Sequence, residues 1–208
     1  PDSVLFNVFH DNVGPTVIEW DENASGSWFT NGNWDFNIPP LSNVQTALFG
    51  GSITASQTVF FNSGVTVKGL RFDTASTVAI AGTDVLTLDA NSGNASVEVL
   101  QGSHQIQAAV ALTGPTTFNA AAGAVVDFNN TIATGGNTIT ITGAGQVNLN
   151  NLVSGGGNVS SSAILGGAGA NEISGDLAST GTLDIDIAGQ GPGEFDSFEV
   201  GGTATLSG

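Results

Sequence analysis

The chain has 208 residues, with 2 Lys or Arg against 18 Asp or Glu and a formal net charge of −16. A nucleic-acid-binding surface needs clustered cations to neutralise phosphates, so this composition excludes that class of partner. An anionic membrane surface would repel the chain, and no apolar run is long enough to span a membrane. The sequence contains no Cys, which excludes disulfides, thiolate chemistry and Cys-ligated zinc.

The first segment, residues 1–20, is an arm that differs from the rest of the chain. It contains the apolar residues Val4, Leu5, Phe6, Val8 and Phe9, followed by a turn and a second apolar run. We expect this arm to form the first coil, to cap the end of a strand stack, or to add as a strand to a neighbouring molecule. An uncovered stack end leaves backbone groups unpaired, and each of these roles would pair them.

The second segment, residues 21–50, contains Trp28 and Trp34 and directly follows Trp20. In an acidic surface protein, Trp28 and Trp34 are candidates for a platform on which a sugar ring stacks. The alternative is a cap, in which large rings seal the end of a narrow core and each buries much apolar area. The pattern favours the cap, because one end of a strand stack must be closed.

The third segment, residues 51–208, consists of short runs that alternate apolar with small polar residues and are separated by Gly and Asn. Residues 138–142 and 146–150 show this period-two pattern, which predicts strands with one buried face. The small side chains suit a narrow core, and residues 80–88 resemble residues 141–149, a loose internal repeat. The sequence therefore predicts an all-β parallel β-helix, or β-solenoid, of about seven coils, with a β-sandwich as the alternative.

Strands are expected at 44–49, 57–61, 65–67, 69–73, 77–80, 84–88, 96–100, 105–112, 124–128, 138–142, 146–149, 159–165, 182–187, 195–199 and 203–206. Their inward residues are expected to be Leu70, Phe72, Val78, Ile80, Leu86, Leu88, Val97, Val99, Val126, Phe128, Ile139, Ile141, Val147, Leu149, Leu183, Ile185 and Ile187. The last strand, which contains Leu206, is expected to be left with a bare edge.

Three parts of the chain resemble bacterial surface proteins that carry autotransporter-associated β-strand repeats, a family that often has a PEP-type C-terminal sorting signal. The matching residues are Trp20, Gly26-Ser27-Trp28, Asn33-Trp34, Pro39 and 47–50, then 141–149, and finally 183–189, 195–200 and 203–206. One departure is Gln45, where the family usually has an acidic residue. The resemblance implies a right-handed parallel β-helix that a bacterium exports, with a structural or adhesive role outside the cell or on its surface.

Paired carboxylates are the first candidates for chemistry. Asp184 and Asp186 are two residues apart on an expected strand, so they share a face at about 7 Å. Glycosidases use two carboxylates at such separations, but outward carboxylates on a strand usually serve solvation. A polysaccharide lyase would also need a cation, and the chain offers only Lys68 and Arg71, for which we expect a salt bridge or a solvated face.

Metal sites have weak support in the sequence. Residues 166–173 nearly match the calcium-binding nonapeptide of β-helices, but the match occurs once, and Asn171 replaces the key Asp. We interpret this segment as a Gly-rich corner, and no cofactor is predicted, with calcium as a weak alternative. His10 and His104 are far apart in sequence and are not expected to be ligands.

The sequence thus predicts a non-catalytic structural rod, found outside the cell or on a bacterial surface. Its expected partner is a second copy of itself, with rods joined head to tail into filaments through the apolar arm and the strand of Leu206. The first alternative is an adhesin or a carbohydrate-binding β-helix that binds a polysaccharide or cell-surface glycan. The second is a polysaccharide-degrading β-helix, which requires a cleft with clustered acids.

Overall fold

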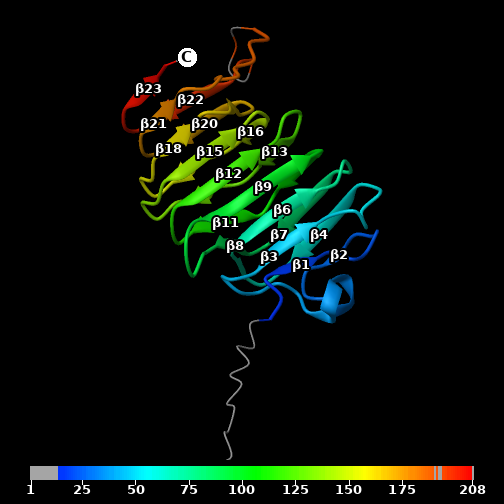
Figure 1. Ribbon diagram of the computed structural model, residues 1–208. Coiled ribbons are helices and arrows are strands. Elements are labelled where there is room, and N and C mark those ends of the chain that lie inside the picture. The colour runs from blue at the N-terminus through cyan, green and yellow to red at the C-terminus, as the bar shows by residue number, and fades with distance from the viewer. Residues whose placement is uncertain (1–13, 190, 192–193, 208) are drawn as a thin grey trace, which may run out of the picture.

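The computed structural model describes residues 14–189, 191 and 194–207, which form a β-solenoid (Figure 1). The chain winds through about six coils, and a typical coil contributes one strand to each of three sheets. Every paired strand lies parallel to its neighbours in the stack, for example β12 to β9 and to β15. This arrangement confirms the all-β solenoid, since a β-sandwich pairs antiparallel strands.

Sheet 1 contains, in stacking order, β1 (Val17–Glu19), β3 (Thr46–Phe49), β6 (Gly69–Asp73), β9 (Ala95–Gln101), β12 (Thr116–Ala120), β15 (Ile139–Gly143), β18 (Val159–Ser161), β21 (Leu177–Ser179) and β23 (Ala204–Leu206). Sheet 2 contains β2 (Gly26–Ser27), β4 (Gln57–Phe61), β7 (Val78–Gly82), β10 (Ser103–Ile106), β13 (Val125–Phe128), β16 (Gln146–Leu149) and β19 (Ile164–Gly166). Sheet 3 contains β5 (Val65–Val67), β8 (Val85–Leu88), β11 (Ala109–Leu112), β14 (Ile132–Ala133), β17 (Val153–Ser154), β20 (Ala170–Ile173) and β22 (Ser197–Val200).

The core is a narrow column of inward side chains, because alternate residues of each strand face the axis. Register stacks Leu70, Val97, Phe118 and Ile141 one above another in sheet 1, and all four are buried. The expected inward residues are buried up to Leu149. The expectation is wrong for residues 182–187, which form isolated bridges rather than a strand: Leu183 and Ile185 are partly buried and Ile187 is 77% exposed.

Coil length varies, which explains why the internal repeat is loose. Paired residues of successive coils are 18 apart between Ser161 and Ser179 but 27 apart between Leu70 and Val97. The similar segments 80–88 and 141–149 therefore occupy different corners. The first joins β7 of sheet 2 to β8 of sheet 3, and the second joins β15 of sheet 1 to β16 of sheet 2.

Some corners contain no glycine, and sequence patterns missed them. Residues 105–112 form two strands, because the N–H groups of Gln107 and Ala108 both donate to the Ile80 carbonyl and turn the chain. Residues 159–165 likewise span β18 and β19. Other corners require glycine: Gly143 has φ +101° and lies against the Ala120 carbonyl, where a Cβ would collide. Of the expected corner 166–173, only residues 167–169 form a corner, with Gly169 at φ +74°, whereas residues 170–173 are the strand β20.

Candidate functional site

The N-terminal end of the solenoid core is filled by the three tryptophans. Trp34 packs edge to face on Trp20 and Trp28, with ring centroids 5.1 and 4.9 Å apart. The Trp28 indole N–H donates to the Pro40 carbonyl at 3.0 Å, and the Trp34 N–H donates to the Trp28 carbonyl at 2.6 Å. Trp28 and Trp34 are 0% and 2% exposed. The sugar-stacking hypothesis for these two residues is therefore wrong, since neither ring has a free face.

Backbone edges at this end are occupied by the segment that follows β2. It contains two 3-10 turns, η1 (Asn31–Asn33) and η2 (Asp35–Asn37). The Asp35 carboxylate accepts the Glu19 N–H of β1 at 2.8 Å, and the Asn33 amide donates to the Ser27 carbonyl of β2 at 3.0 Å. Burial, together with the nearby carboxylate of Asp35, raises the pKa of Glu19 above its ordinary range. Side chains thus occupy one pairing group on each of these two first strands.

The C-terminal end presents an edge instead. The described part of β23 pairs with β21 alone, through Leu177 N–H to the Thr203 carbonyl and Ser207 N–H to the Ser179 carbonyl. In a parallel ladder the intervening residues, Ala204 and Leu206, point their N–H and C=O groups to the other side. Leu206 is 58% exposed. Val4, Leu5, Phe6, Val8 and Phe9, the other residues proposed for assembly, lie outside the described residues.

The core beneath β23 contains polar atoms without partners. The Asn171 side-chain oxygen and the Ser179 hydroxyl are buried and make no hydrogen bond with the described residues. Ser179 replaces the apolar residues that fill the same column in earlier coils, such as Phe118 and Ile141. Buried polar groups are normally paired, but the Trp20 indole N–H at the other end of the core also has no partner among the described residues, so this feature does not distinguish the two ends.

A groove of about 290 Å³ on the outer face of sheet 2 gathers acidic residues. We call it the acidic groove, and it is lined by Asp127, Gln146, Asn148, Asn150, Gly167, Ala168, Asp184, Asp186 and Asp196. The expected shared face of Asp184 and Asp186 is therefore present, although they lie on a loop rather than a strand. Glu194 is not part of this lining. Its carboxylate accepts the Gly191 N–H at 2.6 Å.

Internal hydrogen bonds occupy much of the acidic groove. Asn148 donates to Asp127 at 2.7 Å, and the Gln146 amide donates to both Asn148 and Asp184, at 2.9 and 3.0 Å. Asp196 accepts the backbone N–H groups of Gly169 and Asp186, at 2.7 and 3.1 Å. The bonds from Asn148 to Asp127 and from Gln146 to Asp184 join different coils, which is a structural role.

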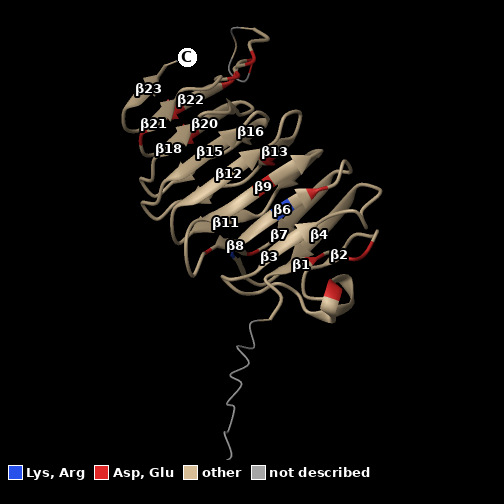
Figure 2. Ribbon diagram, in the orientation of Figure 1, with Lys and Arg blue, Asp and Glu red and all other residues tan. Residues whose placement is uncertain are grey.

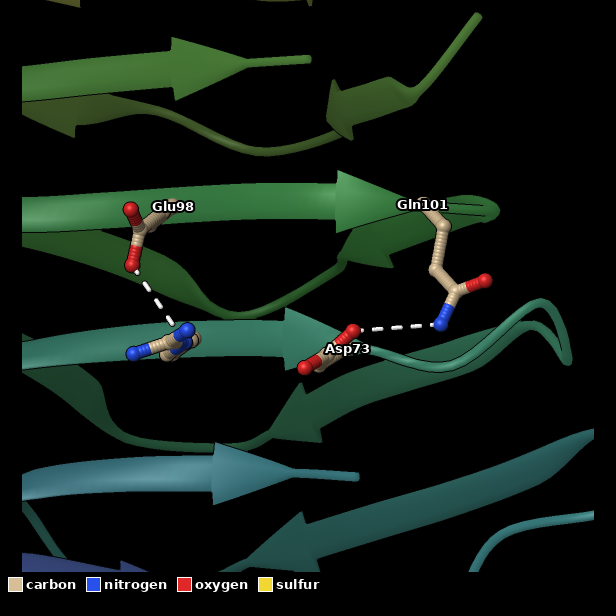
Figure 3. Close-up of polar contacts among 4 residues, drawn as sticks. Asp73, Glu98 and Gln101 are labelled. Carbon is tan, nitrogen blue, oxygen red and sulfur yellow. Dashed lines mark hydrogen bonds and ion pairs between the residues drawn. The ribbon is translucent and has the colours of Figure 1, made fainter. Parts of the chain in front are cut away.

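Neither cation of the chain is near that groove. Arg71, on β6 of sheet 1, forms an ion pair with Glu98 on β9, with 3.4 Å between Nε and the carboxylate. Figure 3 shows Glu98 in this pair, and beside it Gln101 donating to Asp73 at 3.1 Å, where the register shifts by one residue. Lys68 immediately precedes β6. The salt bridge expected for Arg71 is confirmed, and Figure 2 shows the blue residues confined to the N-terminal half of the rod.

A second groove, of about 380 Å³, runs across the coils on the outer face of sheet 1. We call it the hydroxyl groove, and it is lined by Thr138, Asn158, Val159, Ser160, Asp176, Leu177, Ala178, Thr203 and Thr205. Its strands β15, β18 and β21 contain no charged residue. Sequence reasoning missed this site, because its residues are up to 67 positions apart and meet only through the stacking register.

His104 belongs to the core rather than to any of these surfaces. Its Nε2 is 2.8 Å from the Gln101 carbonyl, its Nδ1 accepts the Val78 N–H at 3.2 Å, and its ring stacks on Phe72 at 4.6 Å. Burial lowers the pKa of His104. Across the described residues, no cluster of three or more His, Cys, Asp or Glu could hold a metal ion.

None of the helices among the described residues has the length and apolarity needed to cross a membrane. Comparison with known protein families, with curated proteins and with solved structures finds no match to this chain. The candidate sites therefore rest on their geometry alone.

Proposed function

We propose that this chain is a non-catalytic structural protein, an extracellular or bacterial cell-surface rod that associates head to tail. The observation that carries the proposal is the difference between the two ends. On the first strands, Asp35 occupies the Glu19 N–H and Asn33 the Ser27 carbonyl, whereas β23 pairs on one side only among the described residues. A bare parallel edge is a template for another strand.

The proposed donor is the apolar arm of a second copy, with Val4, Leu5, Phe6, Val8 and Phe9 as the strand that covers Leu206. Contacts between two different surfaces repeat from copy to copy, and so produce filaments rather than closed dimers. The net charge of −16 makes copies repel one another. We therefore expect association to strengthen as salt screens this repulsion.

A structural role also fits the acidic groove better than catalysis does. The carboxylates of Asp127, Asp184 and Asp196 accept hydrogen bonds from neighbouring amides and N–H groups, and both cations of the chain lie on or beside β6. A lyase on this scaffold would require a base or a cationic group beside the acids.

The test is sedimentation velocity and negative-stain microscopy of the purified protein over a range of concentration and salt. Ala204→Pro removes an N–H that points away from β21, so it leaves the native ladder intact and blocks strand addition. We expect it to weaken association about tenfold, the equivalent of one lost hydrogen bond. The control Ala204→Ser keeps the N–H and should associate like the wild type. Monodisperse monomers at every concentration and salt level would refute the proposal.

A further inference from the structure

We infer that the hydroxyl groove is a binding site for a neutral polysaccharide. It lies on the flank of the rod, on the outer face of sheet 1, and does not depend on association through the ends. Two rows of side chains form its walls. Thr138, Asn158, Asp176 and Thr203 precede successive strands and form one row, and Ser160, Ala178 and Thr205 form the other.

The groove has a direct structural cause. Between the two rows, Val159 and Leu177 turn inward and are buried, so the floor consists of backbone. Ala178 has only a Cβ where the paired positions carry Ser160 and Thr205, which lowers the second wall. Stacked strands are about 4.8 Å apart, so the four strands β15, β18, β21 and β23 give a channel about 14 Å long.

The polar groups of the first row are held in place yet keep capacity for a ligand. The Asp176 N–H donates to the Asn158 side-chain oxygen at 3.1 Å, and one Asp176 oxygen accepts the Thr203 N–H at 2.8 Å. Asn158 and Asp176 are exposed, and their side chains make no other hydrogen bond with the described residues. A side chain that is fixed before binding loses little entropy when it binds.

This chemistry selects among possible ligands. Asp176 is the one charged residue in the lining, so the groove lacks both the cations that bind anions and the carboxylates that bind a metal ion. The backbone of β18 and β21 is already paired on both sides, so a peptide strand cannot add there. Hydroxyls of a neutral sugar chain match the Thr, Ser, Asn and Asp groups, while the Ala178 methyl contacts sugar C–H groups.

The experiment titrates the protein with cellohexaose, chitohexaose, mannohexaose and the acidic control hexagalacturonate, by calorimetry and by NMR of the oligosaccharide. We expect at least one neutral hexasaccharide to bind and hexagalacturonate not to bind. Ala178→Phe fills the channel at an exposed position and should weaken binding about tenfold or more. Ala133→Phe, at an exposed position of β14 on sheet 3, is the matched control and should not change binding.

A second variant tests the polar contacts without adding bulk. Thr205→Val removes one hydroxyl and keeps the side-chain shape, and should weaken binding about three- to tenfold. Thr87→Val, on β8 of sheet 3, is its control. The inference is overturned if no neutral hexasaccharide binds, if only hexagalacturonate binds, or if the Ala178 and Ala133 variants weaken binding equally. Sedimentation of the same variants reports separately on rod association, so failure of one proposal is distinguishable from failure of the other.

Discussion

The two ends of this rod differ in whether other groups occupy the edge of the outermost strand. At the N-terminal end, three tryptophans fill the core and Asp35 occupies the outward N–H of β1. At the C-terminal end, Leu206 is half exposed, and β23 pairs with β21 alone among the described residues. A solenoid coil contacts only its neighbours, so a repeated pattern by itself cannot end the stack. Closure here depends on a segment that differs from the repeat in composition and shape.

The largest effect should come from opening the closed end. Trp28→Ala removes a fully buried ring that contacts Trp34, Phe49 and Phe61. We expect a loss of about 3–5 kcal/mol in the free energy of unfolding, measured by guanidinium denaturation with circular dichroism. Phe60→Ala, at a 49% exposed position on the neighbouring β4, should cost less than about 1 kcal/mol. Equal losses for the two variants would show that the tryptophans do not seal the core.

A smaller effect should follow from freeing the first strand edge. Asp35→Ala leaves the Glu19 N–H unpaired, and we expect it to cost about 1–2 kcal/mol, measured by the same denaturation. Asp35→Asn keeps an acceptor oxygen and relieves the charge repulsion that helps to raise the pKa of Glu19, so it should be nearly neutral. If occupation of the Glu19 N–H prevents assembly at this end, Asp35→Ala should form new oligomers in sedimentation and Asp35→Asn should not. If Asp35→Ala has the stability and sedimentation of the wild type, Asp35 does not contribute to the difference between the two ends.

The sequence predicts the repetitive middle of the rod better than its ends. The first and last residues of strands such as β4, β5 and β6 agree with the prediction. In these strands, glycines and polar residues flank a run of clear apolar alternation. The strand β12 was missed although it lies in the middle and pairs with both β9 and β15. Residues 182–187 were assigned wrongly, because alternation does not show whether a neighbouring strand is present to pair. Burial of Trp28 was favoured by the capping argument. The hydroxyl groove was not foreseen, since coils of unequal length hide which residues stack.

Lowering the pH should reduce the stability of the fold through the buried side chain of His104. His104 is neutral in the fold, since one ring nitrogen accepts the Val78 N–H and burial lowers its pKa from the ordinary value of 6.5. Its contribution to stability is therefore complete above pH 6.5 and is lost as the pH falls below that value. His104→Gln should remove this part of the pH dependence in denaturation curves between pH 7.5 and about 5. A parallel decline of the wild type and the variant would mean that other groups dominate.

The smallest effect is expected at the open end, where it separates stability from association. Leu206→Ala truncates a side chain that is 58% exposed and has no strand above it among the described residues. We expect the free energy of unfolding of the dilute monomer to change by less than about 0.5 kcal/mol. Association at high concentration should weaken, because the donated strand would lose an apolar contact. A large loss of monomer stability would instead show that Leu206 is already part of a closed core, and the two ends would then no longer differ as proposed.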